Sequence, residues 1–155
     1  MIKFKLYDII STWFYSGYLK PASGTWGTLA SLPFCLYVTY NYGIAGIIIA
    51  SIGLFAIGLW AAHQYELETG RHDSSHVVID ETVGMMIACI PLVYVFNIKV
   101  AVLCFVIFRL FDAVKIGPVG WLDKHINGAF GVMIDDVAAG LMTIIIILGY
   151  LVWMH

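Results

Sequence analysis

Two pairs of neighbouring carboxylates stand where a polar segment of the sequence gives way to an apolar one: Asp80 with Glu81, and Asp135 with Asp136. Acidic residues in the first turn of a helix interact favourably with the helix dipole, which would account for each pair alone. Carboxylates that converge, however, repel one another unless a cation lies between them. Because ligand sets made only of oxygen suit Mg²⁺, we expect these four residues to form a Mg²⁺ site.

A third group of charged residues has a spacing of three: Arg109, Asp112 and Lys115. On a helix this spacing brings the side chains near one another, where they could form a self-neutralising ladder of ion pairs. Together with Asp123 and the two acidic pairs, however, the acids of these segments outnumber the nearby bases. Ionisable groups at membrane depth are costly and tend to line functional sites. We therefore interpret the whole set as one composite site.

The segment Gly24-Thr25-Trp26-Gly27-Thr28 directly precedes an apolar run. We expect Thr25 or Thr28 to cap the helix that follows. Backbone N–H groups that are unpaired at a helix start can face an anion. An ordinary capped turn is the alternative interpretation, because so short a pattern is weak evidence of a ligand site.

The composition indicates a membrane protein. Of the 155 residues, 61% are hydrophobic and 12% are charged, whereas soluble domains carry about 25% charged residues. The length predicts one integral-membrane domain over residues 1–155. A formal net charge of −2 gives no reason to expect a nucleic-acid partner.

The uncharged runs predict an all-α fold, a polytopic membrane helix bundle with about four to five apolar passes. The passes are expected at residues 28–40, 44–65, 82–98, 100–114 and 137–155, and Asn41-Tyr42-Gly43 is the expected turn between the first two. Residues 2–17 mix charged with aromatic side chains and are expected to form an interfacial amphipathic helix.

The basic residues predict the orientation in the membrane. If the passes alternate in direction, every Lys and Arg except Lys99 lies on one side or at its boundary. The positive-inside rule makes that side cytoplasmic. We therefore expect the N-terminus, the loop 66–81 and the segment 115–136 to be cytoplasmic, and the composite site with them.

The histidines and cysteines are not expected to do chemistry. His72 and His76 have a spacing that can bind zinc on a helix, but their segment has the composition of a loop. We interpret both as solvated side chains. Cys35, Cys89 and Cys104 lie inside apolar runs and form no CxxC motif, so we interpret them as small packing residues.

Four blocks of the sequence together resemble a known family, the phosphatidylglycerophosphatase A family of bacterial membrane lipid phosphatases. The similarity extends over residues 16–140, and the order and spacing of the blocks make it specific. The blocks are Ser23-Gly24-Thr25-Trp26-Gly27-Thr28 with Pro33, Val78-Ile79-Asp80-Glu81 with Gly84, Arg109-Leu-Phe-Asp112-Ala-Val-Lys115 with Pro118 and Asp123, and Gly131-Val-Met-Ile-Asp135-Asp136 with Ala139-Gly140.

The resemblance implies an enzyme of the bacterial inner membrane that uses Mg²⁺ to remove the terminal phosphate of phosphatidylglycerophosphate. It also implies which residues form the site and what each of them does. Catalytic roles fall to Asp80, Glu81, Asp112 and Asp123, phosphate binding to Arg109, Lys115, Gly24, Thr25 and Thr28, and metal binding to Asp80, Glu81, Asp135 and Asp136. Attack by water and an aspartyl-phosphate intermediate both remain open. The sequence departs from the family after Lys115, where Ile116-Gly117-Pro118 replaces the common Pro-x-Pro.

Two alternatives from other classes are a small cation transporter and a structural membrane subunit. A transporter would favour carboxylates near the middle of the bilayer or on both of its sides. A phosphatidyltransferase of the CDP-alcohol type is a rival enzyme, but its Asp-Gly…Ala-Arg motif is absent from the sequence. The small residues Ala139, Gly140 and Thr143 permit close helix approach, either within one chain or in an oligomer.

Overall fold

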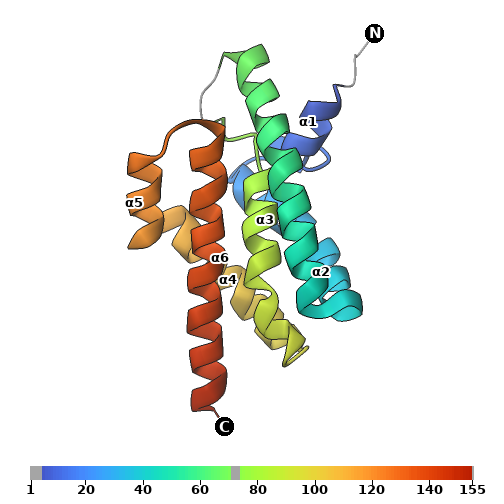
Figure 1. The fold of residues 1–155 in the computed structure, drawn as a ribbon, viewed down its shortest axis with the longest axis vertical. Coiled ribbons are helices and arrows are strands. Elements are labelled where there is room, and N and C mark those ends of the chain that lie inside the picture. The colour runs from blue at the N-terminus through green and yellow to red at the C-terminus, as the bar shows by residue number, and fades with distance from the viewer. Residues whose placement is uncertain (1–4, 71–73, 155) are drawn as a thin grey trace.

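The computed structural model describes residues 5–70 and 74–154, and it is helical throughout with no strand in these ranges (Figure 1). The prediction of an all-α fold is therefore confirmed. The elements are α1 (Leu6–Ser11), η1 (Ser16–Tyr18), α2 (Ser23–Thr69), α3 (Ile79–Ala88), η2 (Ile90–Val93), α4 (Ile98–Val114), α5 (Pro118–His125) and α6 (Gly128–Trp153), where η marks a short 3₁₀ helix.

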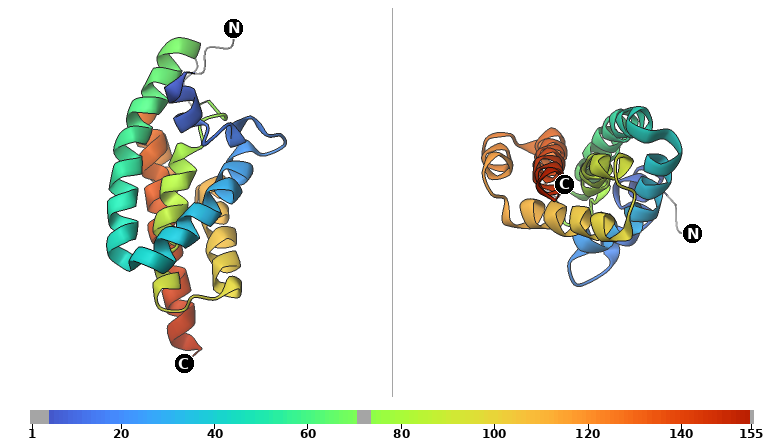
Figure 2. Two further views of the ribbon diagram at one scale, coloured as in Figure 1. Left: turned by 90° about the vertical axis from the view of Figure 1, so that its right-hand side faces the viewer. Right: turned by 90° about the horizontal axis from the view of Figure 1, so that it is seen from below.

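Gly43 divides α2 into two limbs. Its backbone has φ 57° and ψ −149°, a conformation that residues with a side chain rarely adopt. The two limbs run in roughly opposite directions from this point (Figure 2), which confirms the predicted turn at Asn41-Tyr42-Gly43. The first limb begins at Ser23, ahead of the expected Thr28, and includes Pro33.

The predicted number of membrane passes is wrong. Two helices in the described ranges, α2 and α6, are long and apolar enough to span a membrane by length and composition. The apolar run 82–98 is divided among α3, η2 and the start of α4. Pro91 lies in the first turn of η2, and without an N–H group it cannot extend the hydrogen-bonded ladder of α3. With ten residues, α3 measures about 15 Å, half of the hydrocarbon thickness.

The N-terminal helix is shorter than expected. Of the predicted residues 2–17, only Leu6–Ser11 form an α-helix, and residues 1–4 lie outside the described ranges. The chain leaves the helix because Trp13, Phe14 and Tyr15 all have positive φ. The helix packs on the far end of α2, where the rings of Tyr7 and Tyr65 meet edge to face.

The last helix is longer than expected. It begins at Gly128 instead of Val137, so Asp135 and Asp136 lie inside α6 and not ahead of it. Both side chains are buried, with 4% and 3% of their surface exposed. The helix therefore carries its two acids into the packed interior of the bundle.

Two glycines allow α3 and α6 to pack closely against each other. A Cβ atom at Gly140 would lie 2.6 Å from the carbonyl oxygen of Gly84, and one at Gly84 would lie 2.6 Å from the carbonyl oxygen of Asp136. Neither position has room for a larger residue. The small face of α6, including Ala139 and Thr143, is accordingly buried within the chain.

The cysteines belong to the apolar core, as expected. Cys35, Cys89 and Cys104 are free thiols and fully buried. They join the core cluster that also includes Phe108 and Met85. Their interpretation as packing residues is confirmed.

Candidate active site

A pocket of about 140 Å³ lies where α3, α6 and the end of α4 meet. Its walls are mostly polar, in contrast to the apolar core below it. It is lined by Ser74, Ser75, Val77, Asp80, Glu81, Asp112, Lys115, Val132, Asp135 and Asp136. Five of the six acids predicted from the sequence therefore line one cavity, and Asp123 does not.

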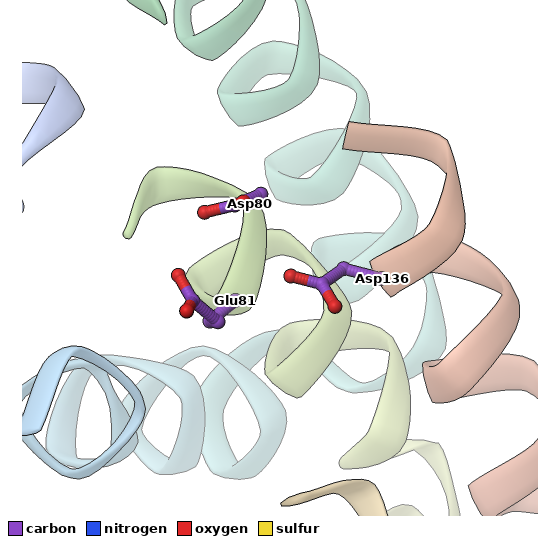
Figure 3. Close-up of side chains that lie close together, drawn as sticks. All are labelled: Asp80, Glu81 and Asp136. Carbon is purple, nitrogen blue, oxygen red and sulfur yellow. The ribbon is translucent and has the colours of Figure 1, made fainter. Parts of the chain in front are cut away.

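Three carboxylates converge at this pocket. Oxygen atoms of Asp80, Glu81 and Asp136 all lie within 4.8 Å of one another, with α3 supplying the first two and α6 the third (Figure 3). Asp80 and Asp136 are buried, and Glu81 is partly buried. The close packing of α3 on α6 thus joins two acids from one segment with one from a segment more than fifty residues away.

The electrostatics of this cluster suit a cation. Burial raises the pKa of Asp80 to about 7, and burial followed by the neighbouring Asp80 charge raises the pKa of Glu81 well above its ordinary value. Asp80 Oδ1 and Glu81 Oε2 are buried and have no hydrogen-bond partner among the described residues. Since unpaired carboxylate oxygens are the ligands that Mg²⁺ takes, Asp80, Glu81 and Asp136 fit a bound Mg²⁺.

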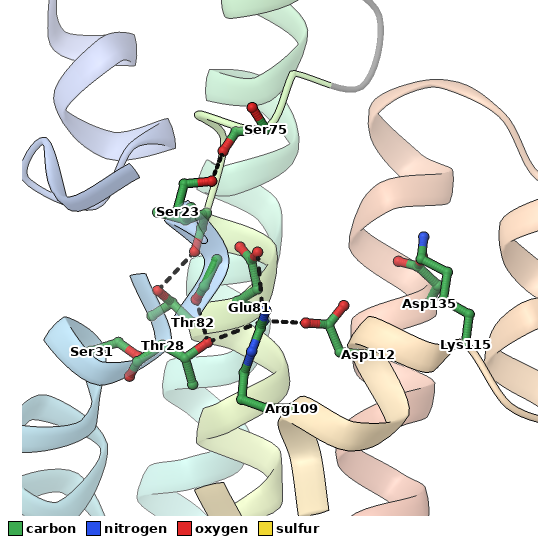
Figure 4. Close-up of polar contacts among 12 residues, drawn as sticks. Ser23, Thr28, Ser31, Ser75, Glu81, Thr82, Arg109, Asp112, Lys115 and Asp135 are labelled. Carbon is green, nitrogen blue, oxygen red and sulfur yellow. Dashed lines mark hydrogen bonds and ion pairs between the residues drawn. The ribbon is translucent and has the colours of Figure 1, made fainter. Parts of the chain in front are cut away.

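Arg109 flanks the carboxylates from α4. Its Nη1 atom lies 3.8 Å from Glu81 Oε1 and 3.5 Å from Thr28 Oγ1, and it pairs with Asp112 one helical turn along (Figure 4). Its Nε atom is buried and has no partner among the described residues. Arg109 therefore keeps a buried donor available beside the pocket.

Lys115, at the end of α4, forms ion pairs with two acids. It pairs with Asp123 and lies 3.0 Å from Asp135 Oδ2. Burial acts to lower the pKa of Lys115, but the hydrogen bonds that it donates to these two carboxylates outweigh burial and raise the pKa. Asp135 thus contacts a fixed cation, whereas the adjacent Asp136 joins the three-carboxylate cluster.

The start of α2 borders the same region. A Cβ atom at Gly24 would lie 3.0 Å from Nη2 and 3.1 Å from Nη1 of Arg109. The expected capping by Thr25 or Thr28 is wrong, because Ala22 is the N-cap residue and no side chain caps the helix. The Thr28 hydroxyl donates instead to the carbonyl of Gly24, at 2.8 Å. Thr25 is partly buried in the same turn.

Sequence reasoning missed four residues of the pocket: Ser74, Ser75, Val77 and Val132. The two serines lie in a segment with the composition of a loop, and no motif or spacing in the sequence indicated that they belong to a site. Ser75 accepts a hydrogen bond from the Ser23 hydroxyl through its backbone carbonyl, which connects the loop to the start of α2. Only tertiary structure brings these segments together.

The interpretation of His76 as a solvated side chain is wrong. Its ring is partly buried, lies 4.8 Å from the ring of Tyr18 and has Nδ1 3.1 Å from the carbonyl oxygen of Gly17. His72 lies outside the described residues. His76 therefore belongs to the wall between η1 and the loop that leads to α3.

Gly24 provides a test of this arrangement that removes no charged side chain. Gly24→Ala is expected to lower kcat/KM by about tenfold or more, because the methyl group would displace Arg109 and Glu81. The matched control is Gly53→Ala, also in α2, where a Cβ atom would meet nothing within 4 Å. Steady-state kinetics of both variants check the prediction, and equal activity would contradict it.

The comparisons with known proteins identify the family of the chain. The family model for phosphatidylglycerophosphatase A matches residues 9–151. The chain is 31% identical to the phosphatidylglycerophosphatase A of Haemophilus influenzae, over 94% of this chain and 89% of the relative. It is 32% identical to that of Escherichia coli, over 88% and 78%.

A third relative carries a different substrate in its name. This Bacteroides thetaiotaomicron protein, provisionally named a phosphatidylinositol-3-phosphatase, is 33% identical over 90% of this chain and 89% of its own. No solved structure matches the chain. The family match covers all the residues that line the pocket. The chain therefore belongs to the phosphatidylglycerophosphatase A family and is a phosphatase.

Proposed function

We propose that this protein hydrolyses the terminal phosphate monoester of phosphatidylglycerophosphate with the help of Mg²⁺, giving phosphatidylglycerol and phosphate. The observation that carries the proposal is the cluster of Asp80, Glu81 and Asp136, whose oxygens lie within 4.8 Å of one another beside Arg109. The names of the two phosphatidylglycerophosphatase A relatives support the choice of substrate.

Residues in and beside the pocket would each bind a different part of a phosphate monoester. Arg109 offers its guanidinium group, whose parallel N–H donors match two phosphoryl oxygens. A Mg²⁺ ion held by Asp80, Glu81 and Asp136 would polarise a phosphoryl oxygen and acidify a water molecule. Lys115 adds a positive charge on the opposite wall, where it balances Asp135. Arg109, Lys115 and a bound Mg²⁺ would together offset the negative charge of the monoester dianion.

Asp112 is the proposed general base. It lines the pocket and does not belong to the three-carboxylate cluster. When Arg109 turns to the phosphate, the Asp112 carboxylate is released from their ion pair and can accept the proton of the attacking water. The water oxygen then bonds to phosphorus, and the bond from phosphorus to the glycerol oxygen breaks. That oxygen takes a proton from solvent and leaves as a hydroxyl of phosphatidylglycerol, and Asp112 releases its proton to solvent.

The direct test is phosphate release by the purified protein in detergent, with Mg²⁺ and with a chelator. Phosphatidylglycerophosphate should be hydrolysed only with Mg²⁺, and faster than phosphatidylinositol 3-phosphate, the lipid suggested by the third relative. Glu68→Gln is the matched control, since Glu68 is exposed and pairs with Lys5 far from the pocket. Release that is unchanged by the chelator, or faster from the inositol lipid, would contradict the proposal.

The two alternatives from other classes are not favoured. A permeation path would spread its acids along the bundle, whereas here five carboxylates line one pocket. A structural subunit would not need buried carboxylate oxygens without partners, such as those of Asp80 and Glu81. The family match to phosphatases points the same way.

We further propose that the protein lies in the bacterial inner membrane as a multi-pass protein, with its pocket on the cytoplasmic side. The apolar helices α2 and α6 support a membrane location. Helix α4 supports the orientation. It carries Lys99 in its first turn, at the end of the bundle where α2 bends, and it ends at Lys115 in the lining of the pocket (Figure 2). The other basic residues of the described ranges then lie toward the cytoplasm.

Thiol labelling tests the orientation. Lys124→Cys and Lys99→Cys, both at exposed positions, are introduced after the three buried cysteines have been replaced. A membrane-impermeant reagent should label position 99 in cells whose outer membrane is permeable, and position 124 only after the inner membrane is opened. Labelling of position 124 in intact spheroplasts would reverse the assignment.

A further inference from the structure

A second pocket adjoins the active site on the side of the N-terminal segment. It has a volume of about 410 Å³ and is lined by Gly17, Lys20, Pro21, Ala22, Ser23, Ser75 and His76. Ser75 lines both pockets. The hydrogen bond from the Ser23 hydroxyl to the Ser75 carbonyl lies at their boundary (Figure 4). A molecule with two polar groups could therefore occupy both pockets at once.

The two pockets differ in charge. Among the described residues, five carboxylates and one lysine line the active-site pocket, whereas Lys20 and no carboxylate line the second pocket. Lys20 is exposed and forms no ion pair with any residue in the ranges 5–70 and 74–154. The second pocket thus presents an uncompensated positive charge, which suits an anion.

His76 adds a hydrogen-bond acceptor to the same wall. Its Nδ1 atom lies 3.1 Å from the carbonyl oxygen of Gly17, and because a carbonyl can only accept, Nδ1 carries the hydrogen. In the neutral imidazole the other nitrogen, Nε2, is then an acceptor. The ring also lies 4.8 Å from the ring of Tyr18, tilted by 38° against it, and this contact helps to hold the imidazole in place. A hydroxyl group is the complementary ligand.

We propose that the second pocket binds the remainder of the lipid headgroup, with Lys20 on the phosphodiester and His76 on the glycerol hydroxyl. This inference rests on the proposed function, because it assumes that the terminal monoester occupies the neighbouring active site. The phosphodiester carries one negative charge, which the single charge of Lys20 balances. The pair of pockets selects lipids in which a glycerol unit separates a terminal monoester from a phosphodiester.

The test compares two lipids that share the monoester but differ in the rest of the headgroup. Phosphatidic acid has a terminal phosphate and no headgroup phosphodiester, and its inhibition constant reports binding whether or not it is hydrolysed. Lys20→Gln is expected to raise the KM for phosphatidylglycerophosphate by about 10- to 100-fold, the range for a hydrogen bond to a charged group. Its kcat and the inhibition constant of phosphatidic acid should stay unchanged.

Lys124→Gln is the matched control, because it removes an exposed lysine from α5, outside the lining of both pockets. It should leave KM unchanged, and Lys20→Arg should restore most of the affinity. A substrate with propane-1,3-diol in place of the headgroup glycerol should bind wild type about threefold to tenfold more weakly. His76→Ala should abolish that difference.

The outcomes separate the two proposals. If wild type does not hydrolyse phosphatidylglycerophosphate, the proposed function fails and the headgroup assignment fails with it. If wild type hydrolyses this lipid but Lys20→Gln weakens both lipids equally, or neither, the second pocket is overturned while the proposed function stands. A KM effect confined to phosphatidylglycerophosphate supports the pocket.

Discussion

Asp136→Asn is expected to reduce phosphate release by about two orders of magnitude or more, the scale of losing one strong electrostatic element of a catalytic site. Asp136 supplies the α6 oxygen of the three-carboxylate cluster, so an amide in its place weakens the hold on Mg²⁺. The protein should still fold, because removing one of several converging negative charges relieves repulsion. Higher Mg²⁺ should restore part of the activity by mass action.

A second measurement reports the metal without the reaction. Mg²⁺ should raise the thermal unfolding temperature of the wild type, because a ligand that binds only the folded state stabilises it. This shift should be much smaller in Asp136→Asn and unchanged in the control Glu68→Gln, whose carboxylate pairs with Lys5 outside the pocket. Equal shifts of the unfolding temperature in all three proteins would show that Asp136 does not bind the metal.

The neighbouring acid should behave differently. Asp135 lies 3.0 Å from Lys115 and is not a member of the three-carboxylate cluster. A defect in Asp135→Asn should therefore persist at high Mg²⁺. This contrast between adjacent residues distinguishes a metal ligand from a residue that positions a lysine.

Arg109→Lys is expected to reduce phosphate release by about a hundredfold. If Arg109 served only to balance Asp112 and Glu81, one positive charge would replace another and the loss would be small. If it binds the phosphate through two parallel N–H groups, lysine cannot reproduce that geometry. The buried Nε atom, which has no partner among the described residues, supports the second role.

A Mg²⁺ titration of hydrolysis at fixed lipid fraction separates Arg109→Lys from Asp136→Asn. The defect of Arg109→Lys should remain at every Mg²⁺ concentration, because the missing contact is to the phosphate. The Mg²⁺ shift of the unfolding temperature should also remain close to that of wild type. If the activity of Arg109→Lys recovers fully at high Mg²⁺, or is near normal at ordinary Mg²⁺, then Arg109 has a purely structural role.

The sequence by itself determined the chemical character of the site. The order of the four motif blocks specified the family, and the excess of acids over bases in these blocks predicted that carboxylates would converge. Five of the six predicted acids line one pocket. Local chemistry also located the bend in α2, because Gly43 can adopt a backbone conformation that other residues resist.

Only the tertiary structure determines which acids join the three-carboxylate cluster and which contact a lysine. Adjacent residues on a helix point about 100° apart, and here Asp135 contacts Lys115 while Asp136 joins Asp80 and Glu81. The packing of Gly84 against Gly140 determines which of them meets Asp80 and Glu81. That contact joins segments more than fifty residues apart, and no local pattern encodes the rotation of one helix against another.

The number of spanning helices was likewise decided by the fold. An apolar run indicates only that a segment avoids water, and the same composition suits a lipid-facing helix and one buried by its neighbours. The run 82–98 contains most of the ten-residue helix α3 and all of the 3₁₀ helix η2, with Val83, Met85 and Met86 buried inside the bundle. Which apolar segments face lipid is settled by packing between helices, a property of the whole chain and not of any one segment.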